Sequence, residues 1–277
     1  MEKKFKGQTA LITGATDGIG LELARCCARD GYDVILIARD ADELAQTAQQ
    51  ISAEFGVKAE GRAADLFNVE EAFRIYAEIK AEGTRIDVLI NNAGQGVYGA
   101  FTGTDIDREL AIIQLNISSL VVLTKLYMQE MVARDSGKIL QLGSIVSKSP
   151  SPYQAVYGGT KAFIYMFSQG LISELESSKV TMTVLMPGPT DTDFFHKADA
   201  EGMTAYVDGD LADPAKVAKD GYEAMQEGES KIVSGFGNKL QMAMGMFMPD
   251  EAIAGQTKKQ HELSDNAIDL KIEPTDE

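Results

Sequence analysis

Short apolar runs rich in β-branched residues alternate along the chain with longer stretches of helical periodicity. The apolar runs predict buried strands at residues 9–13, 34–37, 88–90, 138–142 and 180–186. The stretches between them predict helices at about 18–30, 40–55, 68–82, 105–134 and 153–178, with Asp40 and Asn68 as N-caps. Strands this apolar, separated by helices, indicate a parallel sheet covered on both faces. We therefore expect a doubly wound parallel sheet of the Rossmann type, with three α/β/α layers.

The chain of 277 residues has the length of one large α/β domain, which we place at residues 1–250. The sequence becomes polar and acidic after Pro249, and residues 251–277 are expected to form a loosely held tail. The preceding run, residues 240–248, is rich in methionine. It either packs as a short core helix or meets another surface, and core packing is favoured because methionine fills irregular gaps.

Composition narrows the functional classes. No run of about 18 consecutive apolar residues exists and the N-terminus lacks a signal-like apolar region, so we expect a cytoplasmic protein without a membrane span. The formal net charge of −16 argues against a nucleic-acid partner and against attraction to anionic membranes. The two cysteines, Cys26 and Cys27, are adjacent in a predicted helix and indicate neither a disulfide framework nor a metal site.

A glycine-rich turn follows the first predicted strand and opens a helix. Glycines at such a place allow a tight turn and a close approach of the backbone to a pyrophosphate, while the helix N-terminus supplies N–H groups and positive partial charge. This position favours a dinucleotide site over a merely structural turn. The candidate binding residues of the turn are Gly14, Thr16, Asp17, Gly18, Ile19 and Gly20.

The end of the second predicted strand bears on the choice of dinucleotide. An acidic residue there would bind the adenosine ribose hydroxyls of NAD, but the chain has Ala38 followed by Arg39. A guanidinium can bind a 2′-phosphate, so NADP(H) is favoured over NAD(H). Asp17, inside the turn, and Asp40, beside Arg39, complicate this prediction, although Asp40 is the expected helix cap.

Tyr157 and Lys161 lie four residues apart in a predicted helix, so their side chains project from one face. An ammonium beside a phenol favours the phenolate and lowers the tyrosine pKa. Moving that pKa from about 10 to about 7 takes roughly 4 kcal/mol, more than one exposed ion pair gives, and a bound oxidised nicotinamide could supply further positive charge. The same spacing also occurs on ordinary solvated helix faces.

Five motifs in order make the chain resemble the short-chain dehydrogenase/reductase family up to about residue 235. They are the glycine turn, Asn91-Asn92-Ala93-Gly94, Ser144, the Tyr157 and Lys161 pair, and Pro187-Gly188. The resemblance implies a catalytic tetrad of Asn116, Ser144, Tyr157 and Lys161. In it Tyr157 is the proton donor in reduction and Ser144 binds the carbonyl oxygen. Lys161 binds the nicotinamide ribose and lowers the Tyr157 pKa, and Asn116 holds a water that relays protons.

The resemblance also implies the remaining cofactor contacts. Beside Tyr157 and Lys161, these residues are Asp65, Leu66, Asn91, Ala93, Gly94, Pro187, Gly188, Thr190 and Thr192. Other interpretations stay open, because Asn91-Asn92 is also ordinary turn chemistry and Asn116 could merely brace a kinked junction. Gly159-Thr160 stands where Ala-Ser is usual before the lysine, and Gly158 precedes it; the two glycines are expected to allow a close approach of the cofactor or of a partner helix.

The substrate is expected to lie under the segment 190–211, which reads as a mobile lid whose aromatic side chains could equally hold it to the domain. The candidate substrate-binding residues are Ser144, Val146, Tyr153, Phe194 and Phe195. Only Lys148 and Lys197 supply positive charge nearby, so a small uncharged ketone, aldehyde or alcohol is favoured.

The sequence therefore predicts an NADP(H)-dependent oxidoreductase that interconverts a carbonyl compound and its alcohol, with Tyr157 as general acid and base. The alternatives are a non-catalytic NAD(P)-binding sensor and an NAD-dependent alcohol or hydroxysteroid-type dehydrogenase. Apolar residues on the two long helices, at 105–134 and 153–178, predict a homo-dimer or homo-tetramer. They are Val121, Val122, Leu123, Leu126, Phe163, Met166 and Phe167.

Overall fold

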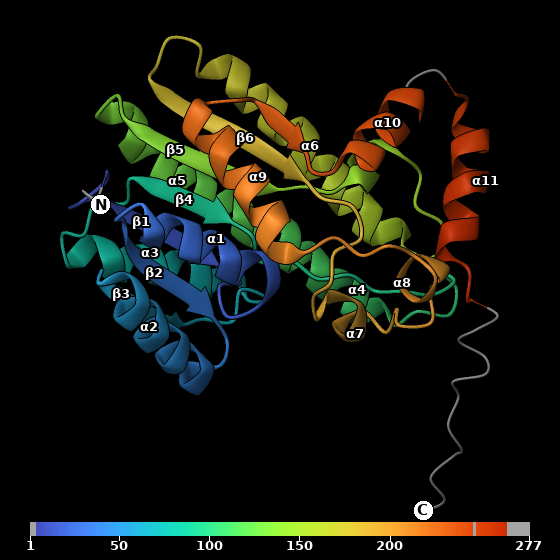
Figure 1. Ribbon diagram of the computed structural model, residues 1–277, viewed down its shortest axis with the longest axis horizontal. Helices are drawn as coiled ribbons and strands as arrows, with labels where there is room; N and C mark the ends of the chain where they lie inside the picture. Colours follow the sequence, from blue (N-terminus) through green and yellow to red (C-terminus); the bar gives the residue numbers. More distant parts are fainter. Residues whose placement is uncertain (1–3, 246–247, 265–277) are drawn as a thin grey trace, which may run out of the picture.

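A seven-stranded parallel sheet forms the centre of the computed structural model, which describes residues 4–245 and 248–264 (Figure 1). The strand order is β3-β2-β1-β4-β5-β6-β7, and the reversal of direction beside β1 makes the fold doubly wound. The strands are β1 (Thr9–Thr13), β2 (Asp33–Ala38), β3 (Ala59–Ala63), β4 (Val88–Asn91), β5 (Gly137–Leu142), β6 (Val180–Met186) and β7 (Lys231–Val233). The predicted parallel Rossmann sheet is confirmed.

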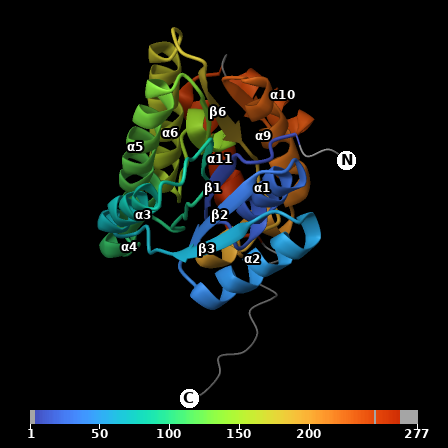
Figure 2. The same cartoon turned by 90° about the vertical axis from the view of Figure 1, so that its left-hand side faces the viewer.

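Helices cover both faces of the sheet, as Figure 2 shows along the edge of the sheet. One face carries α1 (Gly18–Arg29), α2 (Ala41–Phe55) and α9 (Pro214–Glu227), and the other carries α3 (Val69–Ala81), α5 (Leu120–Ala133) and α6 (Ala155–Glu174). Each layer has its own apolar core against the sheet. Asp40 and Asn68 cap α2 and α3 as predicted, each accepting backbone hydrogen bonds from the first turn.

The two strands that the apolar pattern did not predict, β3 and β7, are the two edges of the sheet. The central strands are buried on both faces, so their sequences are continuously apolar. Strand β3 reads Ala-Glu-Gly-Arg-Ala and β7 has only three residues. An edge strand needs no continuous apolar run because part of it faces solvent.

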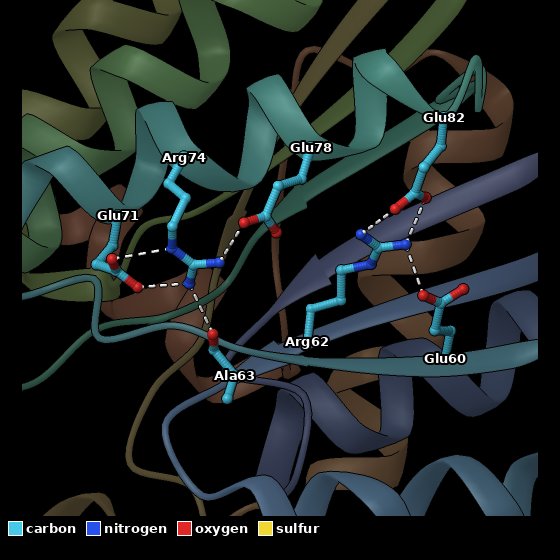
Figure 3. A network of polar contacts seen from close by, with 7 residues as sticks. All are labelled: Glu60, Arg62, Ala63, Glu71, Arg74, Glu78 and Glu82. Atoms are coloured by element: carbon cyan, nitrogen blue, oxygen red, sulfur yellow. Dashed lines mark hydrogen bonds and ion pairs between the residues drawn. The ribbon is translucent and has the colours of Figure 1, made fainter.

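Ion pairs tie the edge strand β3 to helix α3 (Figure 3). The guanidinium of Arg62 donates to Glu60, at 2.5 Å, and to both carboxylate oxygens of Glu82, at 2.7 and 2.5 Å. Arg74 donates to the carbonyl oxygen of Ala63 at 2.8 Å and pairs with two glutamates of its own helix. Such a network is worth more than isolated surface pairs, and it attaches a polar strand without an apolar face.

The long helix expected over 105–134 is interrupted. It consists of α4 (Ile106–Ile113), a π-helical turn (Gln114–Ser119) and α5. A π-turn shifts the helix face by an extra residue and often occurs at a functional site. In the described part of the chain, the stretch Ile106–Ala133 is also the one candidate membrane span by length and composition, but it packs against the sheet with 44% of its most apolar window buried.

The chain beyond Pro249 departs from the expected loose tail. Residues Asp250–His261 form helix α11, which buries Thr257 and His261 and packs beside the short helix α8 (Thr204–Val207). The polar composition suggested a loose tail, but a surface helix needs to bury only one of its sides to pack against the domain. Residues 265–277 of the predicted tail lie outside the described residues.

The methionine-rich run was expected in the core, and that prediction is wrong for the described residues. Helix α10 (Phe236–Gly245) has no buried residue, although Met242 packs against a small cluster around Tyr165. The exposed fractions of Leu240 and Met244 are 50% and 51%. Of the described part of the run, Gln241, Met242, Met244 and Met248 line a cavity, so their side chains are available to a ligand.

The C-terminal segment fastens the predicted lid. The backbone N–H and the hydroxyl of Thr204 both donate to the carbonyl oxygen of Glu262, at 2.9 and 3.0 Å, and Met203 forms an antiparallel bridge with Leu263. From the other side, the Tyr98 hydroxyl donates to the carbonyl oxygen of His261 at 2.7 Å. These bonds restrain the segment 190–211 in a closed position.

Removal of residues 250–277 should therefore release the lid. We expect faster proteolytic cleavage within 190–211 and a melting temperature lower by at least about 2–4 °C, because the truncation deletes the partners of Thr204, Met203 and Tyr98. Limited proteolysis with mass spectrometry and a thermal scan measure both effects. A control that removes only residues 265–277 keeps all of these contacts and should behave as the parent does; equal behaviour of the two truncations would contradict the fastening role of α11.

Candidate active site

One cavity of about 820 Å³ opens at the carboxyl ends of the strands. Loops that follow parallel strands meet at this edge, and the reversal of strand order beside β1 leaves a crevice there. Each half of the cavity comes from a different set of segments. The first half is lined by residues within 14–20, 37–43, 64–67, 92–95 and 187–192, and the second by residues within 142–149, 154–161, 194–210 and 241–261.

The glycine turn between β1 and α1 is fixed by the loop after β4. The side-chain amide of Asn92 donates to the carbonyl oxygens of Thr13 and Gly14, at 2.9 Å each, while the Thr13 hydroxyl accepts from the backbone N–H of Asn92 at 3.0 Å. A Cβ on Gly20 would lie 1.9 Å from the Gly14 carbonyl oxygen, so no other residue fits there. All six predicted residues of the turn line the cavity. The glycines form a narrow backbone cradle of the kind that suits a pyrophosphate.

Arg39 lies at the rim of this half with its guanidinium 5.3 Å from the centre of the Phe67 ring. No ion pair to Arg39 is found among the described residues. The two nearby acids have other roles, because Asp40 accepts from the backbone N–H groups of Asp42 and Glu43, and Asp17 accepts from the N–H of Asp193 at 3.4 Å. The guanidinium is therefore available to an anionic group of a ligand.

The loops after β3 and β4 supply the predicted adenosine side of the cavity, with one exception. Asp65, Leu66, Ala93 and Gly94 line it. Asn91 does not, because its side chain points to the face of the sheet covered by α5, where its amide donates to Thr124 and to Gln141 at 3.0 Å each. Side chains alternate in direction along a strand, so the next residue, Asn92, reaches the turn instead.

The Tyr157 side chain lies at the junction of the two halves. A hydrogen bond connects it with Ser144, which caps the short 3₁₀ turn Ile145–Lys148 after β5. Burial raises the pKa of Tyr157 to about 12, and the Ser144 hydrogen bond opposes that rise. The Phe194 ring packs against the phenol with 5.2 Å between ring centres. The protein by itself therefore keeps the phenol protonated at neutral pH.

Lys161 extends along the same face of α6 and is almost fully buried. Its Nζ donates to the carbonyl oxygen of Leu142 at 2.8 Å and lies 5.7 Å from the centre of the Tyr157 ring. No carboxylate pairs with it among the described residues, and burial lowers its pKa to about 8. A Cβ on Gly94 would lie 3.3 Å from this nitrogen, so the glycine leaves the ammonium room. The lysine is thus poised to exchange a proton near neutral pH.

Asn116 lies in the π-helical turn and is fully buried behind the cavity wall. Its amide donates to the Gln95 carbonyl oxygen and to the Thr160 hydroxyl, at 2.9 Å each, and its oxygen accepts from the Gln95 N–H at 3.0 Å. These contacts brace the loop after β4 against α6 beside Lys161, which is the alternative role considered from the sequence. The predicted water relay through Asn116 stays a prediction.

The lid follows β6 and runs from the first half of the cavity over the second. Pro187, Gly188, Thr190 and Thr192 line the first half, and Thr192 packs so closely on Gly18 that a Cβ on Gly18 would lie 2.6 Å from the Thr192 methyl group. The short helix α7 (Phe194–Lys197) then places Phe194 and Phe195 in the wall. Phe194, Phe195 and Tyr206 pack with Met203 in a separate apolar cluster, so the lid has a small core of its own.

Comparison with known proteins assigns the family. The model of the short chain dehydrogenase family matches residues 8–202, which include the glycine turn, Ser144, Tyr157 and Lys161. The chain belongs to the short-chain dehydrogenase/reductase family. The chain after residue 202, which includes α9, α10 and α11, lies beyond the matched residues.

The curated relatives of this chain have moderate sequence identity to it. The very-long-chain 3-oxoacyl-CoA reductase of Anas platyrhynchos is 36% identical over 65% of this chain and 59% of its own length. The protein of Haemophilus influenzae named "Probable NADP-dependent dehydrogenase" is 33% identical over 77% of this chain and 86% of its own length. The chain spans between 51% and 64% of the first three curated relatives. The solved short-chain dehydrogenase of Sphingobium yanoikuyae in complex with NADPH has a TM-score of 0.78 at 28% identity, covering 94% of this chain and 99% of that one.

The second half of the cavity differs from the sequence prediction in two places. Tyr153 does not line the cavity, because its backbone adopts a left-handed conformation and its ring packs toward Tyr98. The next residue, Gln154, lines it instead. The sequence also missed the wall formed by α10 and α11, including Met242 and His261. The only signal was the methionine-rich composition, which was assigned to the core.

Burial of Lys161 without a carboxylate should make the stability of the folded protein depend on pH in a specific way. Its pKa of about 8 in the folded protein lies below the ordinary value of 10.5, so between these pH values the unfolded chain binds more protons and stability rises with pH. Lys161→Met removes this contribution. Urea unfolding should show the difference in unfolding free energy between parent and variant changing by roughly 3 kcal/mol from pH 7 to pH 10.5.

The matched control is Lys125→Met, on the exposed side of α5, where the difference from the parent should stay constant over the same pH range. A constant difference for Lys161→Met as well would show that the ammonium is not desolvated as described.

Proposed function

We propose that this protein is an NADP(H)-dependent oxidoreductase that interconverts a ketone or aldehyde and its alcohol. The observation that carries the proposal is that Tyr157, hydrogen-bonded with Ser144 and backed by buried Lys161, lines the same cavity as the glycine turn. A dinucleotide fits the first half, because the glycine backbone cradles a pyrophosphate and Arg39 offers an unpaired guanidinium at the rim. When bound, the dinucleotide supplies or accepts the hydride.

The side chains account for the proton. As negative charge develops on the carbonyl oxygen, the hydroxyls of Ser144 and Tyr157 stabilise it by hydrogen bonds, and Tyr157 transfers its proton to that oxygen. Lys161, with a pKa of about 8, can then return a proton to the phenolate. The high pKa of Tyr157 keeps the phenol in the protonated form that carbonyl reduction needs.

The preference for NADP(H) is supported by Arg39 and by relatives whose names mention NADP or NADPH. The second half of the cavity suits a moderately apolar substrate, because Phe194, Phe195 and Met242 line it. Relatives named very-long-chain 3-oxoacyl-CoA reductase act on a ketone with a long apolar chain, which agrees with such a wall.

Cytoplasmic location and a homo-dimer or homo-tetramer stay predictions. Helix α6 does leave apolar surface open, with exposed fractions of 38% for Phe163 and 70% for Met166.

Tyr157→Phe tests the chemistry. Loss of the hydroxyl removes the proton donor, so kcat for NADPH-dependent carbonyl reduction should fall by about 10²–10⁴-fold, while the affinity for NADPH changes little. Turnover is followed by NADPH absorbance across a panel of ketones and aldehydes, and binding by NADPH fluorescence. Tyr76→Phe on α3, remote from the cavity, is the control and should keep the parent rate. Parent-like turnover by Tyr157→Phe would refute the proposed mechanism.

Arg39→Ala tests the cofactor preference. Removing one charge-assisted contact should weaken NADPH binding by roughly ten- to a hundredfold, while the affinity for NADH, which has no 2′-phosphate, stays within about threefold. Dissociation constants for both dinucleotides are measured by fluorescence titration. Arg29→Ala, at the far end of α1, should change neither. Equal losses for the two dinucleotides would show that Arg39 does not select the phosphate.

A further inference from the structure

A buried amide donor in the substrate half of the cavity has no partner. The Gln154 side chain is 5% exposed, and its Nε2 makes no hydrogen bond within the described structure. Gln154 lines the cavity and precedes Tyr157 by three residues at the start of α6. An unpaired buried donor is costly, so in a cavity wall it indicates a ligand atom that accepts from it.

A complementary acceptor comes from α11. His261 is 6% exposed and lines the same cavity, and its Nδ1 lies 2.8 Å from the carbonyl oxygen of Pro152. Because a carbonyl oxygen only accepts, Nδ1 must carry the proton and Nε2 is left as an acceptor in the neutral ring. Burial lowers the pKa of His261, which keeps the ring neutral. No hydrogen bond to Nε2 is found in the described part of the chain.

The donor and the acceptor are held by one short loop. The carbonyl oxygen of Pro152 binds His261, the carbonyl oxygen of Tyr153 accepts from the N–H of Gly99, and Gln154 begins α6. Gln154 is the N-cap of α6, three residues before Tyr157, and both residues line the same cavity.

We propose that Gln154 and His261 form a recognition site for a hydroxyl group on the carbon next to the reacting carbonyl, so that the substrate is an α-hydroxy ketone or the corresponding diol. A hydroxyl can accept from the Gln154 amide and donate to the His261 nitrogen at once, whereas an ether or a ketone oxygen can only accept. The proposal rests on the proposed carbonyl reductase function and names its substrate class.

A carboxylate does not fit this place. It would accept from Gln154 but meet the lone pair of the neutral His261 ring, and ionisation of that ring is opposed by its burial. Lys148, one of the lysines that line the cavity, packs its ammonium 4.5 Å from the centre of the Tyr165 ring. An apolar group in this place would leave the Gln154 and His261 nitrogens unpaired. A site built to hydrogen-bond a hydroxyl therefore strongly rejects an analogue that lacks the hydroxyl.

The test compares ketones that differ only in this hydroxyl, using the full-length protein with NADPH. Hydroxyacetone is paired with butanone, and phenacyl alcohol with propiophenone, so that a methyl group replaces the hydroxyl in each pair. The readout is the ratio of kcat/KM within a pair, compared between parent and variant, which cancels the intrinsic reactivity of the ketones. A purely structural role of either residue would lower both rates and leave this ratio unchanged.

Two variants remove one half of the site each. Gln154→Leu keeps the shape and loses the donor, and the preference for the hydroxy ketone should fall at least about tenfold. His261→Asn keeps an amide that can bond to Pro152 and loses the second nitrogen, and the ratio should fall at least about fivefold. Gln169→Leu is the matched control, since its Nε2 is also buried and unpaired on α6 but lies outside the cavity; its ratio should equal that of the parent.

An unchanged ratio in both Gln154→Leu and His261→Asn would overturn the proposal, as would an equal fall in Gln169→Leu. If the parent reduces no carbonyl compound at all, the proposed function fails instead. In that case ligand-observed NMR with the NADPH-loaded protein judges the site alone: preferential binding of phenacyl alcohol over propiophenone, lost in His261→Asn, supports it, and equal binding refutes it.

Discussion

Lys161 sits in the interior without a carboxylate, and the surrounding loops are arranged around this ammonium. Its charge is met by the carbonyl oxygen of Leu142 at the end of β5, and Gly94 after β4 has no Cβ to crowd it. The π-turn then brings Asn116 behind the same loop, where it holds the backbone of Gln95. Burial of the ammonium costs stability, and it also lowers the lysine pKa to about 8, so that Lys161 can exchange protons near neutral pH.

One part of the cavity is lined by residues that the family model matches, and another part by residues that follow the matched region. The glycine turn, Ser144, Tyr157 and Lys161 fall within the residues matched by the family model, which ends at residue 202. The far wall is built by α10 and α11, after that limit, and α11 also fastens the lid through Glu262 and Leu263. The matched residues thus contribute the glycine turn, Ser144, Tyr157, Lys161 and the start of the lid, and α10 and α11 add the rest of the lining from beyond the match.

The candidate site was predictable where a motif forces a backbone shape and not where a side chain could turn either way. The glycine turn, Ser144, Tyr157 and Lys161 all line the cavity, because their spacing fixes a turn and a helix face. For Asn91 and Tyr153 the prediction was wrong by one residue, because the next residues, Asn92 and Gln154, line the cavity instead. Asn91 points to the face of the sheet covered by α5 by the alternation of strand side chains, and the left-handed backbone at Tyr153 turns its ring toward Tyr98.

The sequence by itself determined the five central strands, the helices between them and the face of α6 that Tyr157 and Lys161 share, because burial on both sides demands continuous apolar runs and helix spacing sets one face. The tertiary structure decided the edges and the cover. Strand β3 is attached by Arg62 and its glutamates, and the acidic segment after Pro249 becomes a helix that closes the cavity. These polar segments are held at the sheet edge and over the cavity by residues that are distant in the sequence. Neither composition nor periodicity shows such distant contacts, so the sequence alone did not predict them.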